Sequence, residues 1–196
     1  MAADRLRVLI VEDEALIASG LSFCLDELGH ETAGITASGD AALAFVEREA
    51  PDLILMDINI PGPDGIAVME RLKERYHVPC VFVTGYSDEQ LIRRAESVCA
   101  YGYIIKPVDV HDLNAAINIA MSRHRELCAM SSSLSQARQA LEDRKLIDRA
   151  KGILMDTYEM KEAQAMRFLQ KKSRELNKKL PALAVEIIEA NRNFHA

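Results

Sequence analysis

Four short apolar runs in the first half of the chain constrain its fold most strongly. They are LRVLIV (6–11), DLILMD (52–57), PCVFVT (79–84) and YGYIIK (101–106). Runs of this length that are rich in β-branched residues are typical of parallel strands buried on both faces. A weaker strand is expected at 30–36, and helical patterns occupy about 14–28, 39–49, 65–76 and 88–99. Because strands alternate with helices, the sequence predicts an α/β fold: a doubly wound, five-stranded parallel sheet.

After Pro107 the pattern becomes purely helical. No proline occurs from Asp109 to about Thr157, where we expect one long helix interrupted only by Gly152. Within it, apolar residues follow one another at spacings of 3, 4, 3 and 4: Leu127, Met130, Leu134, Ala137 and Leu141. This spacing is typical of a coiled-coil seam, although an amphipathic helix packed on its own domain is the alternative. Two shorter helices are expected at about 161–176 and 181–191, which gives a small all-α three-helix domain.

Charge divides the chain in the same way as the helical pattern does. Residues 1–136 hold 11 Lys and Arg against 21 Asp and Glu, whereas residues 137–196 hold 13 against 9. An acidic front and a basic back indicate two modules with different partners. We therefore expect a first domain at 1–120, a helical coiled-coil linker at 121–141 and a second domain at 142–196.

The apolar runs and the cysteines predict a cytoplasmic location. No run approaches the roughly 20 residues that a membrane-spanning helix needs, and the first one ends at Glu12, too early for a signal peptide. The four cysteines are scattered, without the spacing of a metal site or a disulfide framework. We expect no membrane partner.

Polar residues stand where the predicted strands end. Glu12 and Asp13 follow the first strand, and Asp57, Thr84 and Lys106 end three others. Ligands of such sheets bind at the carboxyl ends of the strands, near the point where the strand order reverses. Three converging carboxylates require a cation, and a hard divalent ion such as Mg²⁺ suits them. With Lys106 and Thr84 nearby, the site could stabilise a phosphoryl group on Asp57, although each residue alone also fits a cap or a loop.

The same segments carry a family resemblance. VLIVEDE, PDLILMDINIPGPDG, VFVTGYSDE and GYIIKP resemble the receiver domain of two-component response regulators. The resemblance implies that Asp57 is the phosphoacceptor and takes its phosphoryl group from a sensor histidine kinase. It also implies that Mg²⁺ is held by Glu12, Asp13, Asp57 and the backbone carbonyl of Asn59. No metabolic enzyme activity is expected, only hydrolysis of the phosphoaspartate.

The resemblance assigns further roles around the acceptor. Thr84 and Lys106 would bind the phosphoryl oxygens, with a cis peptide bond between Lys106 and Pro107. Tyr103 falls at the position of the switch aromatic residue, for which simple edge packing is the alternative. Pro63 replaces a common methionine, which stiffens the loop without disabling it.

The basic part of the chain resembles a second family. RKLIDRAKGILMD (144–156) and the residues at fixed distances after it resemble the ANTAR domain, a three-helix RNA-binding antitermination module. The sequence departs from the family at Glu159, where a glycine tends to end the first helix, and at Lys161, where a Ser, Thr or Asp caps the second. Ser173 replaces a small apolar residue. Candidate RNA-binding residues are Arg149, Lys151, Tyr158, Lys171, Lys172, Lys178 and Lys179.

Together the two resemblances imply a regulator. Phosphorylation of Asp57 would pair two chains through the 127–141 seam, and the homodimer would bind a stem-loop in a transcript leader. The alternative is a regulator whose helical tail binds a protein. DNA binding is not expected, because the helices lack a tight helix-turn-helix spacing. For Gly152 we expect close packing against a second helix near Ala165, with close approach of an RNA backbone as the alternative.

Overall fold

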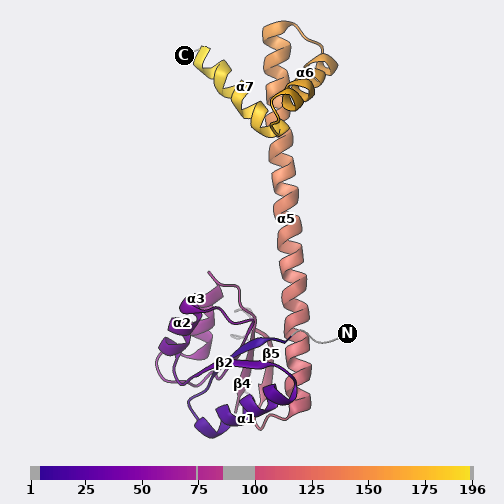
Figure 1. Ribbon diagram of the computed structural model, residues 1–196. Coiled ribbons are helices and arrows are strands. Elements are labelled where there is room, and N and C mark those ends of the chain that lie inside the picture. Colours follow the sequence, from indigo (N-terminus) through magenta and orange to yellow (C-terminus); the bar gives the residue numbers. More distant parts are fainter. Residues whose placement is uncertain (1–4, 74, 86–99, 195–196) are drawn as a thin grey trace. The chain divides into compact units, whose positions relative to one another are not determined.

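The computed structural model describes residues 5–73, 75–85 and 100–194 (Figure 1). The helix expected at 88–99 lies outside these residues. The chain separates into two compact units, Met1–Cys128 and Ala129–Ala196. Within the described ranges, no helix combines the length and the apolar character needed to span a bilayer.

The first unit is built on a five-stranded parallel sheet. Its strands are β1 (Arg7–Val11), β2 (Glu31–Thr36), β3 (Leu53–Met56), β4 (Cys80–Thr84) and β5 (Ala100–Ile105). They lie in the order β2-β1-β3-β4-β5, so the direction of winding reverses between β1 and β3. The predicted doubly wound sheet is confirmed.

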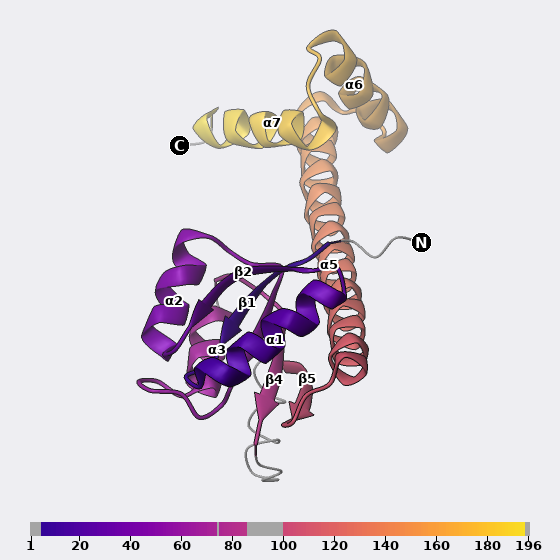
Figure 2. The ribbon, with the colours of Figure 1, turned by 60° about the horizontal axis from the view of Figure 1, so that its bottom comes forward.

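Helices cover both faces of this sheet. They are α1 (Ala15–Glu27), α2 (Gly39–Arg48), α3 (Gly65–Lys73) and the first turns of α5 (Val110–Tyr158). Because side chains alternate along a strand, Leu9 and Val11 pack with α2 and α3, whereas Val8 and Ile10 pack with α1 and α5. Figure 2 shows α2 and α3 beside each other, on the side of the sheet away from α5.

Helix α5 runs for 49 residues without a break. It includes Ser131–Ser133, all exposed, so the serine triplet does not interrupt the helix. All four of the larger apolar residues of the predicted seam are at least half exposed: Leu127, Met130, Leu134 and Leu141. The seam therefore does not pack on its own unit.

The second unit joins the end of α5 to α6 (Glu162–Glu175) and α7 (Leu180–Phe194). Its buried core takes residues from all three helices: Ala150, Leu154, Ala165, Leu169, Leu183, Ala184 and Ile188. The long helix and the small three-helix domain are thus confirmed.

The departures near the helix ends have local explanations. Glu159 has a φ of 53°, the left-handed conformation that favours glycine. Lys161 is the N-cap of α6 and offers no capping oxygen, but its backbone N–H donates to Gln164 Oε1 at 2.9 Å. The hydroxyl of Ser173 donates to the Lys178 carbonyl oxygen at 2.6 Å and so ties α6 to the turn that follows.

The expectation that Gly152 packs closely against a second helix is wrong. Apart from atoms of its own helix turns, a Cβ placed on Gly152 would meet nothing within 4 Å. The reason is helical geometry: Gly152 is two residues from buried Ala150 and two from buried Leu154, and residues so spaced lie on opposite sides of a helix.

Candidate functional site

Three carboxylates meet at the point where the sheet reverses its winding. Glu12 and Asp13 follow β1 directly, and Asp57 follows β3. The backbone N–H of Asp57 donates to the Val11 carbonyl oxygen at 2.9 Å, which fixes the acceptor residue against β1. Glu12 is 2 % exposed and Asp57 is 6 % exposed, while Asp13 is open to solvent. One carboxylate oxygen from each of the three lies within 4.8 Å of the others.

Lys106 joins two of these carboxylates. It follows β5, and its backbone N–H donates to the Thr84 carbonyl oxygen at 2.9 Å. Its Nζ lies 2.6 Å from Asp57 Oδ2 and 2.7 Å from Glu12 Oε2. The Lys106 ammonium group therefore contacts the two buried carboxylates, Glu12 and Asp57. Among the described residues no ion pair joins it to Asp13.

The electrostatics of the pocket follow from burial and from these contacts. Burial raises the pKa of Glu12; the hydrogen bond and charge of Lys106 lower it, and the nearby Asp57 raises it again, so the pKa stays above its usual value. Burial lowers the pKa of Lys106, but hydrogen bonds to Asp57 and Glu12 outweigh burial and leave the pKa raised. Lys106 is consequently a fixed positive charge at physiological pH.

The donor set fits a hard divalent cation. It consists only of carboxylate oxygens, one group is solvent-accessible, and a single lysine cannot neutralise all three charges. Receiver domains bind Mg²⁺ through such a pocket. Asn59 also borders the site, because its backbone N–H donates to Asp57 Oδ1 at 3.0 Å. The role of its carbonyl as a metal ligand stays a prediction.

The remaining predicted site residues lie on β4 and β5. Thr84 ends β4 and is buried. Tyr103 pairs with Phe82 in the sheet register and is 52 % exposed. The peptide bond between Lys106 and Pro107 is cis, as expected. The phosphoryl-binding role of Thr84 and the switch role of Tyr103 stay predictions.

One glycine next to the acceptor was not identified from the sequence. Gly65 begins α3, and its N–H donates to the Ile58 carbonyl oxygen at 3.0 Å. A Cβ at Gly65 would lie 2.3 Å from the Asp57 carbonyl oxygen, so only glycine fits. The glycine that ends PGPDG was the available signal.

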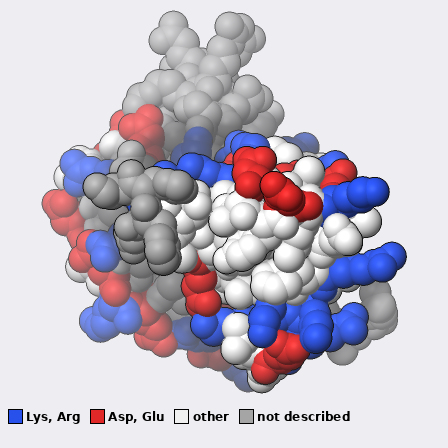
Figure 3. Space-filling view, turned by 90° about the horizontal axis from the view of Figure 1, so that it is seen from above, with Lys and Arg blue, Asp and Glu red and all other residues white. Residues whose placement is uncertain are grey.

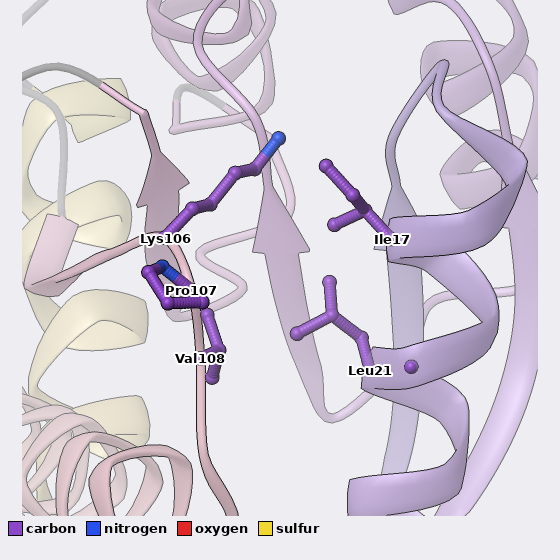
Figure 4. A pocket seen from close by; sticks show the side chains of 6 residues that line it. Ile17, Leu21, Lys106, Pro107 and Val108 are labelled. Atoms are coloured by element: carbon purple, nitrogen blue, oxygen red, sulfur yellow. The ribbon is translucent and has the colours of Figure 1, made fainter.

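A groove beside Lys106 was missed as well. It has a volume of about 400 Å³ and is lined by Ile17, Gly20 and Leu21 of α1 and by Lys106, Pro107 and Val108. Figure 4 shows the α1 side chains facing Lys106 and Pro107 across it. Leu16 and Phe23, on the outer face of α1, are strongly exposed. The available signal was the pair of apolar residues Ile17 and Leu21, which lie one helical turn apart on α1.

Many of the predicted RNA-binding lysines have acidic partners. Lys151 Nζ lies 2.8 Å from Asp148 and 2.9 Å from Glu162. Three more pairs join lysines to glutamates: Lys171 and Lys172 with Glu175 at 3.8 and 2.8 Å, and Lys178 with Glu186 at 2.5 Å. In Figure 3, basic and acidic side chains alternate around an uncharged area.

The other candidates in this unit are more open. Arg149 and Lys179 are exposed, and no ion pair joins either one to another described residue. Tyr158, at the end of α5, is 64 % exposed. The structure thus brings Lys171 and Lys172 together around one glutamate, and it leaves Arg149, Lys179 and Tyr158 free for a ligand.

Comparisons with known proteins agree with this division. Residues 8–118 match the response regulator receiver domain, and residues 135–188 match the ANTAR domain. The transcriptional regulatory protein PdtaR of Mycobacterium tuberculosis is 36 % identical over 183 residues, which cover 93 % of this chain and 89 % of that protein.

Solved structures that resemble the chain include receiver domains. The signal receiver domain of a modulated diguanylate cyclase from Desulfovibrio desulfuricans is 33 % identical, with a TM-score of 0.58 over 62 % of this chain and 98 % of that one. A CheY-like receiver domain protein from Methanospirillum hungatei is 30 % identical, with a TM-score of 0.57 over 63 % and 98 %. The chain belongs to the response regulators, with a receiver domain that precedes an RNA-binding ANTAR domain.

Proposed function

We propose that the protein is a phosphorylation-controlled regulator of transcription antitermination, switched at Asp57 by a sensor histidine kinase. The observation that carries the proposal is the contact of Lys106 with both Asp57 and Glu12, beside Asp13, at the point where the sheet reverses. Charge that arrives on Asp57 meets an ammonium group already in position.

The chain's own residues account for the phosphoryl transfer. A carboxylate oxygen of Asp57 forms the bond to phosphorus while the bond to the kinase histidine nitrogen breaks. Lys106 and the Thr84 hydroxyl would hold the phosphoryl oxygens. Mg²⁺, held by Glu12, Asp13, Asp57 and the Asn59 carbonyl, would neutralise negative charge when bound. Hydrolysis of the phosphoaspartate is the only other reaction we expect.

The surface around Lys106 supports a protein as the phosphoryl donor. Leu16 and Phe23 expose apolar side chains on α1, and the groove between α1 and Pro107 opens beside the acceptor. A kinase domain that docks there could bring its phosphohistidine to Asp57 while it covers these side chains.

The exposed seam of α5 supports a homodimer. Its leucines and Met130 repeat with coiled-coil spacing and find no cover within their own unit. A second copy of the same helix supplies a matching seam. Two ANTAR domains in one particle would then bind RNA together, which is the expected form of the activated protein.

The test is RNA binding by the full chain with and without beryllofluoride, which mimics the phosphoryl group. We expect treatment to increase the retention of hairpin RNA by the wild-type protein and to leave Asp57→Ala unaffected. Asp26→Ala, which removes an exposed carboxylate elsewhere on the receiver, is the control. Equal responses of wild type and Asp57→Ala would refute control by phosphorylation.

A protein-binding tail is the second candidate, and the ion pairs favour it. Lys151, Lys172 and Lys178 are each paired with a carboxylate, which reduces the charge available to RNA. The discriminating measurement is retention on an RNA column by Arg149→Glu and Lys151→Glu, with Arg125→Glu on the receiver unit as the control. Unchanged retention by the first two would support the protein-binding tail.

A further inference from the structure

The helices of the ANTAR domain leave an open groove between them. It has a volume of about 440 Å³ and takes residues from α5, α6 and α7. Ile153, Phe168 and Ile187 form apolar walls, Tyr158 contributes an aromatic ring, and Thr157 and Asn191 contribute polar groups. None of the residues that line the groove is charged, in a unit that is otherwise rich in charge.

The groove is not needed to complete the core of its unit. The fully buried residues of the domain lie deeper, and of the lining only Leu154 is buried to the same degree. Phe168 and Ile187 pack against this core without being fully buried, so part of each side chain remains accessible in the groove. Tyr158 keeps 64 % of its surface exposed although it ends a helix that packs on two others.

The chemistry of the groove matches a nucleobase. A base has two apolar faces that stack on aromatic and aliphatic side chains, and a polar edge that exchanges hydrogen bonds. The Asn191 amide can donate and accept such bonds, and the Thr157 hydroxyl can do the same. A groove of apolar walls with a few polar groups is what an unpaired base requires.

Cations flank the groove where the phosphates of such a nucleotide would continue. Arg149 lies one turn before Ile153 on the same side of α5, is exposed, and has no ion pair with another described residue. Arg192, also exposed, follows Asn191 on α7. These cations favour a nucleic acid over an apolar protein segment, and the seam of α5 already offers a separate surface to a second copy.

We propose that this groove binds one unpaired base from the loop of an RNA hairpin. The proposal rests on the proposed RNA-binding function and adds to it the place where sequence is read. Tyr158 stacks on the base, Phe168 and Ile187 hold its other side, and Asn191 contacts its polar edge.

The experiment uses the full chain treated with beryllofluoride and a pool of RNA hairpins with one fixed stem and a randomised loop. Three variants are compared with the wild type. Tyr158→Ala removes the stacking ring, Ala190→Phe fills the groove from its exposed rim, and Leu176→Ala removes an exposed apolar side chain elsewhere in the unit. Thermal unfolding confirms that each variant is folded.

We expect Tyr158→Ala and Ala190→Phe to weaken loop-dependent retention about tenfold to a hundredfold, and Leu176→Ala to leave it unchanged. Loops that carry 2-aminopurine should change fluorescence on binding to the wild type and not on binding to Ala190→Phe. Retention of the hairpins at wild-type affinity by both groove variants would overturn the proposal. Such a result would instead favour a protein segment as the occupant of the groove. If the wild type itself retains no hairpin, the proposed RNA-binding function fails first and the base pocket fails with it.

Discussion

Replacement of Gly152 by alanine should stabilise the second unit. Gly152 lies in the middle of α5, where glycine costs about 1 kcal/mol relative to alanine. Because an added methyl group would meet nothing within 4 Å, no steric penalty offsets this gain. We therefore expect Gly152→Ala to raise the free energy of unfolding of this unit by about 0.5–1 kcal/mol. For a unit of this size the melting temperature should rise by about 2–8 °C.

The assay is thermal unfolding of the full chain followed by circular dichroism, with urea unfolding as a second measure. Gly20→Ala is the matched control, because Gly20 also lies inside a helix and also has open space at its Cβ position. It should stabilise the receiver unit by a similar amount and leave the second unit unchanged. A lower melting temperature for Gly152→Ala would show that another part of the unit packs closely against Gly152. It would refute the reasoning that places Gly152 on the open side of the helix.

Three other variants test separate features. Glu159→Gly should stabilise the second unit by up to about 1 kcal/mol, because it relieves a left-handed residue at the cost of chain entropy; an unchanged urea midpoint would contradict this. Gly65→Ala should destabilise the receiver by about 1–3 kcal/mol and slow its phosphorylation, measured by urea unfolding and by transfer from a small phosphodonor, since its methyl group would press on the Asp57 carbonyl oxygen. Burial lowers the pKa of His30, and its Nδ1 accepts a hydrogen bond from the Leu6 N–H at 3.4 Å, so the folded protein favours the neutral imidazole. Its contribution to stability is present above the unfolded pKa of about 6.5 and is lost as the pH falls toward the folded pKa. The free energy of unfolding should thus fall from pH 7.5 to 5.5 more steeply in the wild type than in His30→Gln, and equal slopes would refute the role of His30.

Residues at strand ends were predictable because one rule places them. Buried parallel strands read as continuous apolar runs, and their carboxyl ends share one edge of the sheet, so Glu12, Asp57 and Lys106 could be brought together without coordinates. The distances could not be predicted in this way. That Lys106 contacts Glu12 as well as Asp57 depends on where its long side chain lies in the folded pocket, which the strand-end rule does not specify.

Features that depend on side-chain direction were harder to predict. The spacing around Gly152 correctly indicated a helix. The apolar neighbours Ile153 and Leu154 suggested that Gly152 lies on the buried side of this helix, whereas its Cβ position faces open space. The pairing of Lys151 with Glu162 joins two helices across a turn, so no periodicity within one helix reveals it. The groove of the second unit needs three helices to be placed together before it exists at all.

The hydrogen bond between Gly65 and Ile58 closes most of the segment from Asp57 to Gly65 into a ring, which limits how far this loop can move. The N–H of Gly65 returns to the carbonyl oxygen of Ile58, and Pro61 and Pro63 restrict the backbone between them. The loop thus has little conformational freedom to lose when the acceptor is loaded, because folding has already ordered it. We therefore expect the loop after Asp57 to stay in place when the phosphoryl group arrives, and the structural response to fall on β4 and β5 instead.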